Sequence, residues 1–365
     1  MKKIILIISM VLALNANTYA ASVADLMNEA IKPIGKCLYV YGGGWNEPDT
    51  GAGIEAMTMG ISQNWVDFYN ANNSSYDYKT TRYQIHNGLD CTGYVGWSMY
   101  QLFGDKYSKN GYVYLAEEMA QRYSEIFGGQ FIPKGQVTDY KCSDIMSSSG
   151  HAYIVIGECS DGSVLFLHAS PPNVSLCGTY TPEGNSSSEA IELANNYMNT
   201  YFNECYKKYP RCSRNTSYLT DYNQMHWNET VLTDSDGYRN MTPSQILYDM
   251  FETVKLYVND VRIAKNEGVH IKDGTTFAPL RAVSEALGAE VEWFGDEKRI
   301  EITKNGTKIN LFVNSDKAVV NDVQSVLTNP VFIENDRTFV PVRFITENLG
   351  AVVEWKQETK SVKIK

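Results

Sequence analysis

The chain has 365 residues, 43% of them hydrophobic and 20% charged, which is typical of a globular protein with two or three domains. Its formal net charge of −10 argues against general nucleic-acid binding, because phosphates are recognised by basic surfaces. After the N-terminal segment no long apolar stretch follows, so we expect no membrane span in the mature protein.

The first 20 residues have the pattern of a secretory signal peptide. Met1-Lys2-Lys3 is basic, residues 4–14 are apolar, and Thr18-Tyr19-Ala20 ends in a small-x-small cleavage site. We therefore expect cleavage near Ala20 and a secreted or cell-wall-associated protein.

Seven cysteines are present, and Cys91 differs from the rest by its surroundings. The others could form disulfides in an exported protein or serve as small buried apolar residues, and the sequence does not fix their pairing. They are Cys37, Cys142, Cys159, Cys177, Cys205 and Cys212.

Cys91 is predicted to open a helix, because apolar residues follow it at helical spacing from Val95 to Phe103. Free N–H groups and the positive end of the helix dipole would favour the thiolate, which is the reactive form. The N–H of Cys91 is a natural donor to an oxyanion, and Gly93 would let a substrate carbonyl approach the backbone. Asp90 is better suited to capping this helix than to acid catalysis.

Two later histidines are expected to lie close together. His151 begins an alternating run that ends at Gly157, and His168 ends a second run that begins at Val164. Ser160-Asp161-Gly162 between the runs is typical of a hairpin turn. Folding about this turn would let one imidazole accept the Cys91 proton while the other orients it.

These segments resemble the NlpC/P60 family of papain-like cysteine peptidases. The matching pieces are Tyr39-Val40-Tyr41-Gly42-Gly43, Asp90-Cys91-Thr92-Gly93-Tyr94-Val95, Gly150-His151-Ala152-Tyr153-Ile154 and His168-Ala169, in the order of the family. The resemblance implies Cys91 as nucleophile, His151 as general base, His168 as orienting residue and Tyr39 as a substrate-holding residue. With Asp90, Thr92 and Gly93 in support, it implies cleavage of amide bonds in peptidoglycan stem peptides without a metal or organic cofactor.

The chain departs from compact members of that family by two long insertions, at residues 45–88 and 105–149. The first carries many aromatic residues and could roof a cleft or change the substrate. We place the catalytic domain at residues 21–235 and a linker helix at 236–253, where Thr242-Pro243-Ser244-Gln245 forms a capping box.

The C-terminal segment, residues 254–365, contains two units at an offset of 62 residues. Thr276-Phe277-Ala278-Pro279-Leu280-Arg281 corresponds to Thr338-Phe339-Val340-Pro341-Val342-Arg343, and Val291-Glu292-Trp293 to Val353-Glu354-Trp355. Each unit predicts strands, a helix ended by Gly288 or Gly350, and further strands. The segment resembles the copper amine oxidase N-terminal-like domain, but its single histidine, His270, makes a copper site implausible.

The predicted fold class is α+β: a papain-like domain with a cysteine-bearing helix on an antiparallel sheet, followed by a duplicated small α+β domain. The predicted function is a secreted cysteine hydrolase whose C-terminal repeats attach or space it at peptidoglycan or another wall polymer. Two alternatives remain: an acyltransferase or other amide or ester hydrolase on the same fold, and a non-catalytic surface adhesion or scaffold protein. The cleaved bond, the ligand of the repeats and the oligomeric state stay open.

Overall fold

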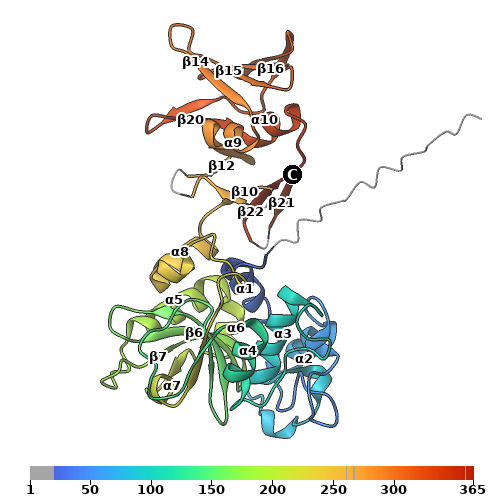
Figure 1. Cartoon of the computed structure of the whole chain (residues 1–365), viewed down its shortest axis with the longest axis vertical. Helices are drawn as coiled ribbons and strands as arrows, with labels where there is room; N and C mark the ends of the chain where they lie inside the picture. The colour runs from blue at the N-terminus through green and yellow to red at the C-terminus, as the bar shows by residue number, and fades with distance from the viewer. Residues whose placement is uncertain (1–19, 260, 266–267, 358) are drawn as a thin grey trace, which may run out of the picture.

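The computed structural model describes residues 20–365 except 260, 266–267 and 358. The predicted signal peptide lies outside the described residues apart from Ala20. The chain is a mixed α+β protein in which an N-terminal unit and the repeats lie at opposite ends of the molecule (Figure 1). Among the described residues no helix combines the length and apolar character needed to cross a bilayer.

The N-terminal unit is built on a nine-stranded sheet with the order β2-β1-β7-β6-β5-β4-β9-β3, and β8 pairs with β7. Neighbouring strands are antiparallel except in the pairs β1–β2 and β7–β8. The strands are β1 (Leu38–Tyr39), β2 (Gly88–Leu89), β3 (Gln130–Ile132), β4 (Ile145–Ser147), β5 (Ala152–Glu158), β6 (Val164–Ser170), β7 (Asn173–Thr179), β8 (Ser213–Arg214) and β9 (Asn223–His226).

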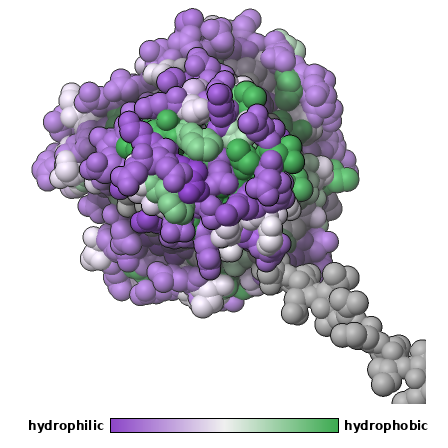
Figure 2. All heavy atoms as spheres, turned by 90° about the horizontal axis from the view of Figure 1, so that it is seen from above, coloured by the Kyte–Doolittle hydropathy of each residue, from purple (hydrophilic) through white to green (hydrophobic). Residues whose placement is uncertain are grey.

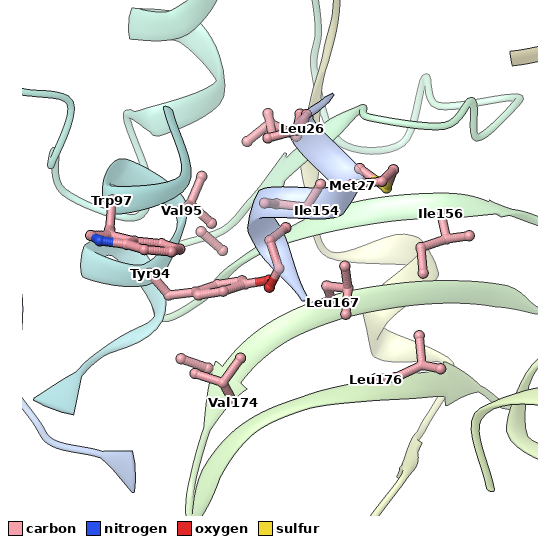
Figure 3. Close-up of a cluster of buried hydrophobic side chains, with 14 of the residues drawn as sticks. Leu26, Met27, Tyr94, Val95, Trp97, Ile154, Ile156, Leu167, Val174 and Leu176 are labelled. Atoms are coloured by element: carbon pink, nitrogen blue, oxygen red, sulfur yellow. The ribbon is translucent and has the colours of Figure 1, made fainter. Parts of the chain in front are cut away.

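Helices cover one face of this sheet. They are α1 (Val23–Ala30), α2 (Gln63–Ala71), α3 (Cys91–Phe103), α4 (Met119–Phe127), α5 (Glu189–Tyr201), α6 (Asn203–Lys208) and α8 (Pro243–Phe251), whereas α7 (Ser217–Thr220) lies on the other face. Side chains of α1, α3, α5 and α8 form one buried cluster with alternate residues of β5, β6 and β7. Figure 3 shows part of it, with Leu26 and Met27 of α1 and Tyr94 of α3 against Ile154, Leu167 and Val174 of the sheet.

The opposite face of the sheet carries a smaller cluster. Tyr153, Val155, Val164 and Phe166 point to this side, where the segment that includes α7 covers them. The predicted alternation of both strands is therefore confirmed, and it places His151 and His168 on this second face.

The predicted linker helix starts where expected, because the capping box of Thr242 and Gln245 is formed at the first turn of α8. This helix nevertheless packs into the core of the N-terminal unit through Ile246, Leu247 and Met250. It is therefore part of that unit rather than a free spacer.

The two repeats interlock. Their strands are β10 (Lys255–Val258), β11 (Val261–Ile263), β12 (His270–Lys272), β13 (Thr275–Pro279), β14 (Glu290–Phe294), β15 (Arg299–Lys304), β16 (Thr307–Phe312), β17 (Lys317–Val320), β18 (Val323–Val326), β19 (Phe332–Glu334), β20 (Arg337–Pro341), β21 (Val353–Lys356) and β22 (Ser361–Ile364). The helices α9 (Leu280–Ala286) and α10 (Val342–Asn348) occupy equivalent places. The first strand of one repeat pairs with the last strand of the other, and the two equivalent hairpins β12–β13 and β19–β20 join in one sheet.

Candidate active site

Cys91 is the first residue of α3, and Asp90 is its N-cap. The Asp90 carboxylate accepts hydrogen bonds from the backbone N–H of Gly93 at 2.7 Å and from the Thr92 hydroxyl at 3.0 Å. The Thr92 hydroxyl in turn accepts a hydrogen bond from the indole N–H of Trp45 at 2.9 Å. Asp90 and Thr92 are thus engaged in holding the helix start, which agrees with the predicted capping role.

Gly93 lies in close contact with the backbone of Gly43 and Gly44. A Cβ atom there would collide with the carbonyl oxygen of Gly43 and with the Cα of Gly44. Gly44 itself has a φ of 89°, in the left-handed region that favours glycine. The glycines therefore let the segment after Tyr39 cross directly over the start of α3.

The sulfur of Cys91 is held next to the start of β5. It accepts hydrogen bonds from the backbone N–H groups of Ala152 and Thr92. Only 6% of the residue is exposed. Burial, followed by the negative charge of Asp90, raises the pKa of the thiol to about 12, against the opposing effect of these N–H groups. The N–H groups at the helix start favour the thiolate as predicted, but in this closed site desolvation outweighs them.

His151 and His168 form a direct pair. In the β5–β6 register Tyr153 lies opposite His168. His151 precedes Tyr153 by two residues, so it is the diagonal neighbour of His168 on the same face of the sheet. The rings lie nearly perpendicular, and Nε2 of His151 is 2.9 Å from Nδ1 of His168. The expectation that the hairpin brings the two imidazoles together is confirmed.

Both imidazoles are held in the neutral form. Burial, together with the positive charge of Arg214, lowers the pKa of His151 to about 3. Burial and the same guanidinium lower the pKa of His168 as well. Nε2 of His168 is buried and has no hydrogen-bond partner among the described residues, so within the pair only Nδ1 of this residue is engaged.

A wall of aromatic residues from the segment after β8 encloses the pair. The Tyr218 ring lies 5.5 Å from the His151 ring and 6.1 Å from the His168 ring, and Tyr222 flanks His151 at 6.5 Å. Arg214 donates from Nε to the Tyr218 hydroxyl at 3.2 Å. Sequence reasoning missed these three residues, because Arg214 reaches the histidines through the pairing of β8 with β7 and no local pattern indicates that pairing.

Tyr39 lies close enough to the site for its hydroxyl to interact electrostatically with Cys91. Burial and then the charges of Cys91 and Asp90 raise its pKa. The ring packs edge-on against Tyr78 of the first insertion, with ring centres 5.5 Å apart. The predicted residues Tyr39, Asp90, Cys91 and His151 are therefore gathered at one place in the fold.

A hollow of about 560 Å³ opens beside His151. Its walls include Ser148, Tyr222 and Asn223, together with the charged side chains of Lys134 and Glu117. Cys91 is not among the lining residues, and Tyr222 lines this hollow while also interacting electrostatically with the Cys91 thiol. Tyr222 therefore adjoins both the hollow and the thiol.

The two insertions build parts of the fold that sequence reasoning had not specified. The first contributes α2, whose Trp65 packs on Trp97 of α3 at 5.9 Å between ring centres. The second contributes α4 and the strands β3 and β4, and β4 extends the sheet by pairing with β5. The second insertion therefore extends the sheet next to β5, the strand that follows His151.

All seven cysteines are free and buried. The sequence left disulfides or buried thiols open for the other six cysteines, and the structure has buried thiols. Burial raises the pKa of the Cys159 thiol to about 12 as well, so a raised pKa alone does not distinguish Cys91 from the others. What distinguishes Cys91 is that its thiol lies by the backbone N–H of Ala152, the residue that follows His151.

Residues 257–364 match the family model of the copper amine oxidase N-terminal domain. No NlpC/P60 domain is detected in the chain by the same comparison. No curated protein matches the chain.

The residues of the matched segment do not fit a copper ion. His270 is the only histidine there, cysteine and methionine are absent from it, and Nε2 of His270 lies 3.4 Å from a carboxylate oxygen of Glu334. A single nitrogen ligand paired with a carboxylate is too little for a copper centre.

Proposed function

We propose that residues 21–235 form a papain-like cysteine hydrolase of the NlpC/P60 type, exported from the cell, which cleaves amide bonds in peptidoglycan stem peptides. The C-terminal repeats would attach or space it at the wall. One observation carries the proposal: a helix-opening cysteine lies against the strand that begins after His151, whose imidazole is bonded to His168 at 2.9 Å.

The pair of histidines determines which nitrogen can act. Because Nε2 of His151 is engaged with His168, Nδ1 of His151 is the nitrogen left to accept the thiol proton. This requires His151 to donate from Nε2–H and His168 to accept at Nδ1. His168 orients the base in this scheme and does not touch the substrate.

Proton transfer from the Cys91 thiol to Nδ1 of His151 creates the thiolate and the imidazolium together. Each charge is unfavourable alone in the buried site. In this scheme the attraction between the imidazolium and the thiolate would offset part of that cost. The thiolate adds to the amide carbon, and the backbone N–H of Cys91 would stabilise the oxyanion. The imidazolium then protonates the leaving amine, which leaves a thioester that water hydrolyses with His151 again acting as base.

Substitution of Cys91 tests the proposal. Cys91→Ala should lower the release of new amino groups from purified peptidoglycan on the order of a thousandfold or more, because the nucleophile is removed. Cys159→Ala is the matched control, since Cys159 is also 6% exposed but lies at the far end of β5. Mass spectrometry of the products, with an added amine acceptor, separates hydrolysis from acyl transfer. Undiminished cleavage by the Cys91 variant would refute the proposal.

A non-catalytic scaffold is the second candidate, and the burial of Cys91 favours it. A reactive thiol is expected to be partly exposed and to have a lowered pKa, whereas this thiol is enclosed. The same experiment decides between the two, because a scaffold releases no product from peptidoglycan either with or without Cys91.

A further inference from the structure

The repeats carry two hollows whose lining residues correspond at the same offset of 62 residues that relates the two repeat sequences. The first, of about 630 Å³, is lined by Arg281, Glu285 and Trp293. The second, of about 620 Å³, is lined by their counterparts Arg343, Glu347 and Trp355. The duplication has therefore produced two similar concave sites and not only two similar folds.

Each hollow takes its walls from both repeats. The helix and the strand after it come from one repeat, and the facing hairpin comes from the other. Ile333 of β19 closes the first hollow, and its counterpart Ile271 of β12 closes the second. Pairing of β13 with β20 is what carries each hairpin across to the neighbouring helix.

The arginines, the glutamates and Trp293 that line the hollows are exposed, whereas Trp355 is half-buried and packs in part against the strand core. Trp293 is 47% exposed, and Arg281, Glu285, Arg343 and Glu347 all lie on exposed helix faces. Exposed ion pairs of the Arg281–Glu285 kind add little stability.

Some exposed positions outside the two hollows have diverged between the repeats, while others, such as Val261 and Val323 or Glu292 and Glu354, are the same in both. Lys272 corresponds to Glu334, and Glu290 corresponds to Val352. What sets the retained tryptophan, arginine and glutamate apart is that they line equivalent hollows together, as two sites for one kind of ligand would require.

The charges lining both hollows balance. Arg343 offsets Glu347 in the second, while in the first Arg281 and Arg337 offset Glu285 and Asp336. A polyanion would find no net positive site here, and an uncharged polar ligand fits better. An exposed indole beside an arginine and a glutamate offers a flat apolar surface with hydrogen-bond donors and acceptors, which suits a sugar ring.

We propose that the repeats carry two equivalent saccharide-binding sites, one in each hollow, which together hold a glycan composed of repeating units. Figure 2, which looks onto the repeat end of the molecule, shows hydrophobic side chains gathered within a hydrophilic surround. This inference deepens the attachment role given to the repeats in the proposed function, and it does not depend on the chemistry of Cys91. Two weak sites on one protein bind a repetitive polymer far more tightly than either site alone.

The test measures binding of the full mature chain, carrying Cys91→Ala, to peptide-free glycan strands prepared from peptidoglycan. Trp293→Ala and Trp355→Ala should each weaken the apparent Kd about tenfold, and the double variant should reduce co-sedimentation to background. Because Trp355 also packs against the strand core, Arg281→Ala and Arg343→Ala provide variants at exposed positions that should not impair folding. Val323→Ala, exposed on the β17–β18 hairpin and lining neither hollow, is the control and should bind normally.

Two results would overturn the assignment: unchanged glycan binding by all the hollow variants, or binding to isolated stem peptides instead of glycan strands. Failure of the hydrolase proposal is separable, because it is measured as cleavage of soluble stem peptides by chains with native Cys91. The tryptophan variants should retain that cleavage.

Discussion

At the scale of single residues, the candidate site is a set of three groups that are all neutral at rest. The thiol of Cys91 has a raised pKa, and the imidazoles of His151 and His168 have lowered ones. Burial dominates each shift, so the groups can ionise readily only as a pair. Under the proposed function, the substrate must reach a thiol next to which Tyr222 lies.

Arg214 contributes to the acid limit of the proposed reaction. Burial is the larger cause of the lowered pKa of His151, and the Arg214 guanidinium lowers it further; because the base must be neutral to act, this charge extends activity to lower pH. Arg214→Met should raise that pKa toward its ordinary value and shift the acid limb of kcat/KM upward by about one pH unit. The pH profile on a soluble stem peptide measures this.

Arg214→Lys supplies the control, since it keeps the positive charge near His151 and His168. It should leave the acid limb close to that of the native protein. If the acid limb of kcat/KM in Arg214→Met matched that of the native protein, Arg214 would serve only to hold Tyr218, to whose hydroxyl it donates.

At the scale of elements, sequence patterns correctly predicted those helices and turns that are stabilised by residues close together in the chain. The helix from Cys91, the hairpin at residues 160–162 and the capping box of α8 all depend on residues a few positions apart. The apolar spacing from Ile191 to Phe202 is likewise local, and it forms α5, with a break at Phe202 before α6.

What sequence reasoning missed depends on contacts between distant segments. Arg214 reaches the histidines because β8 joins β7, and the start of α3 is enclosed because the insertion after Tyr39 places Trp45 on Thr92. The exchange of hairpins between the repeats likewise follows from the pairing of β13 with β20. Periodicity within each repeat carries no information on that pairing.

Asp90 gives the start of α3 a pH-dependent stability. Burial raises its pKa from 3.8 to about 6, against hydrogen bonds from Gly93 and Thr92 that act to lower it. A carboxyl with a raised pKa contributes stability that is fully present below pH 4 and is lost as pH rises through about 6. Asp90→Asn keeps a good N-cap and removes the charge.

Urea unfolding at several pH values checks this. Relative to the asparagine variant, the native protein should lose about 3 kcal/mol of unfolding free energy between pH 4 and pH 7, which is the cost of ionising this carboxyl in place. If the unfolding free energy of the two proteins depended on pH in the same way, ionisation of Asp90 in the folded protein would cost no stability. Asp90→Ala should be less stable than Asp90→Asn by about 1 kcal/mol, because it also loses the cap.

At the scale of the whole molecule, an ion cluster joins the N-terminal unit to the repeats. Arg262 of β11 contacts Asp249 of α8 at 2.6 Å and Asp236 at 3.0 Å, and all three are largely buried. The Tyr238 hydroxyl donates to Asp249 at 2.7 Å. Because α8 belongs to the core of the N-terminal unit, this cluster fixes the first strands of the repeats to it.

Removal of the Arg262 guanidinium should weaken the contact between the N-terminal unit and the repeats. Arg262→Met leaves two buried carboxylates without their partner, which costs about 3–5 kcal/mol, whereas loss of the exposed pairs of Arg122 should cost under about 1 kcal/mol. We expect the native chain to unfold as one calorimetric unit and the Arg262 variant to show two transitions, with Arg122→Ala as the unaffected control. A single transition in both variants would show that backbone and apolar contacts suffice for the joint.

The same cluster should respond to acid. Burial works to raise the pKa of Asp249, but hydrogen bonds and the charge of Arg262 outweigh it and hold the pKa below its ordinary value of 3.8. A carboxyl with a lowered pKa contributes stability that is present above its unfolded pKa and is lost as pH falls through the folded one. The native chain should therefore begin to show two transitions only below about pH 4. Arg262→Met should already show them at pH 7, because its joint no longer depends on that ionisation.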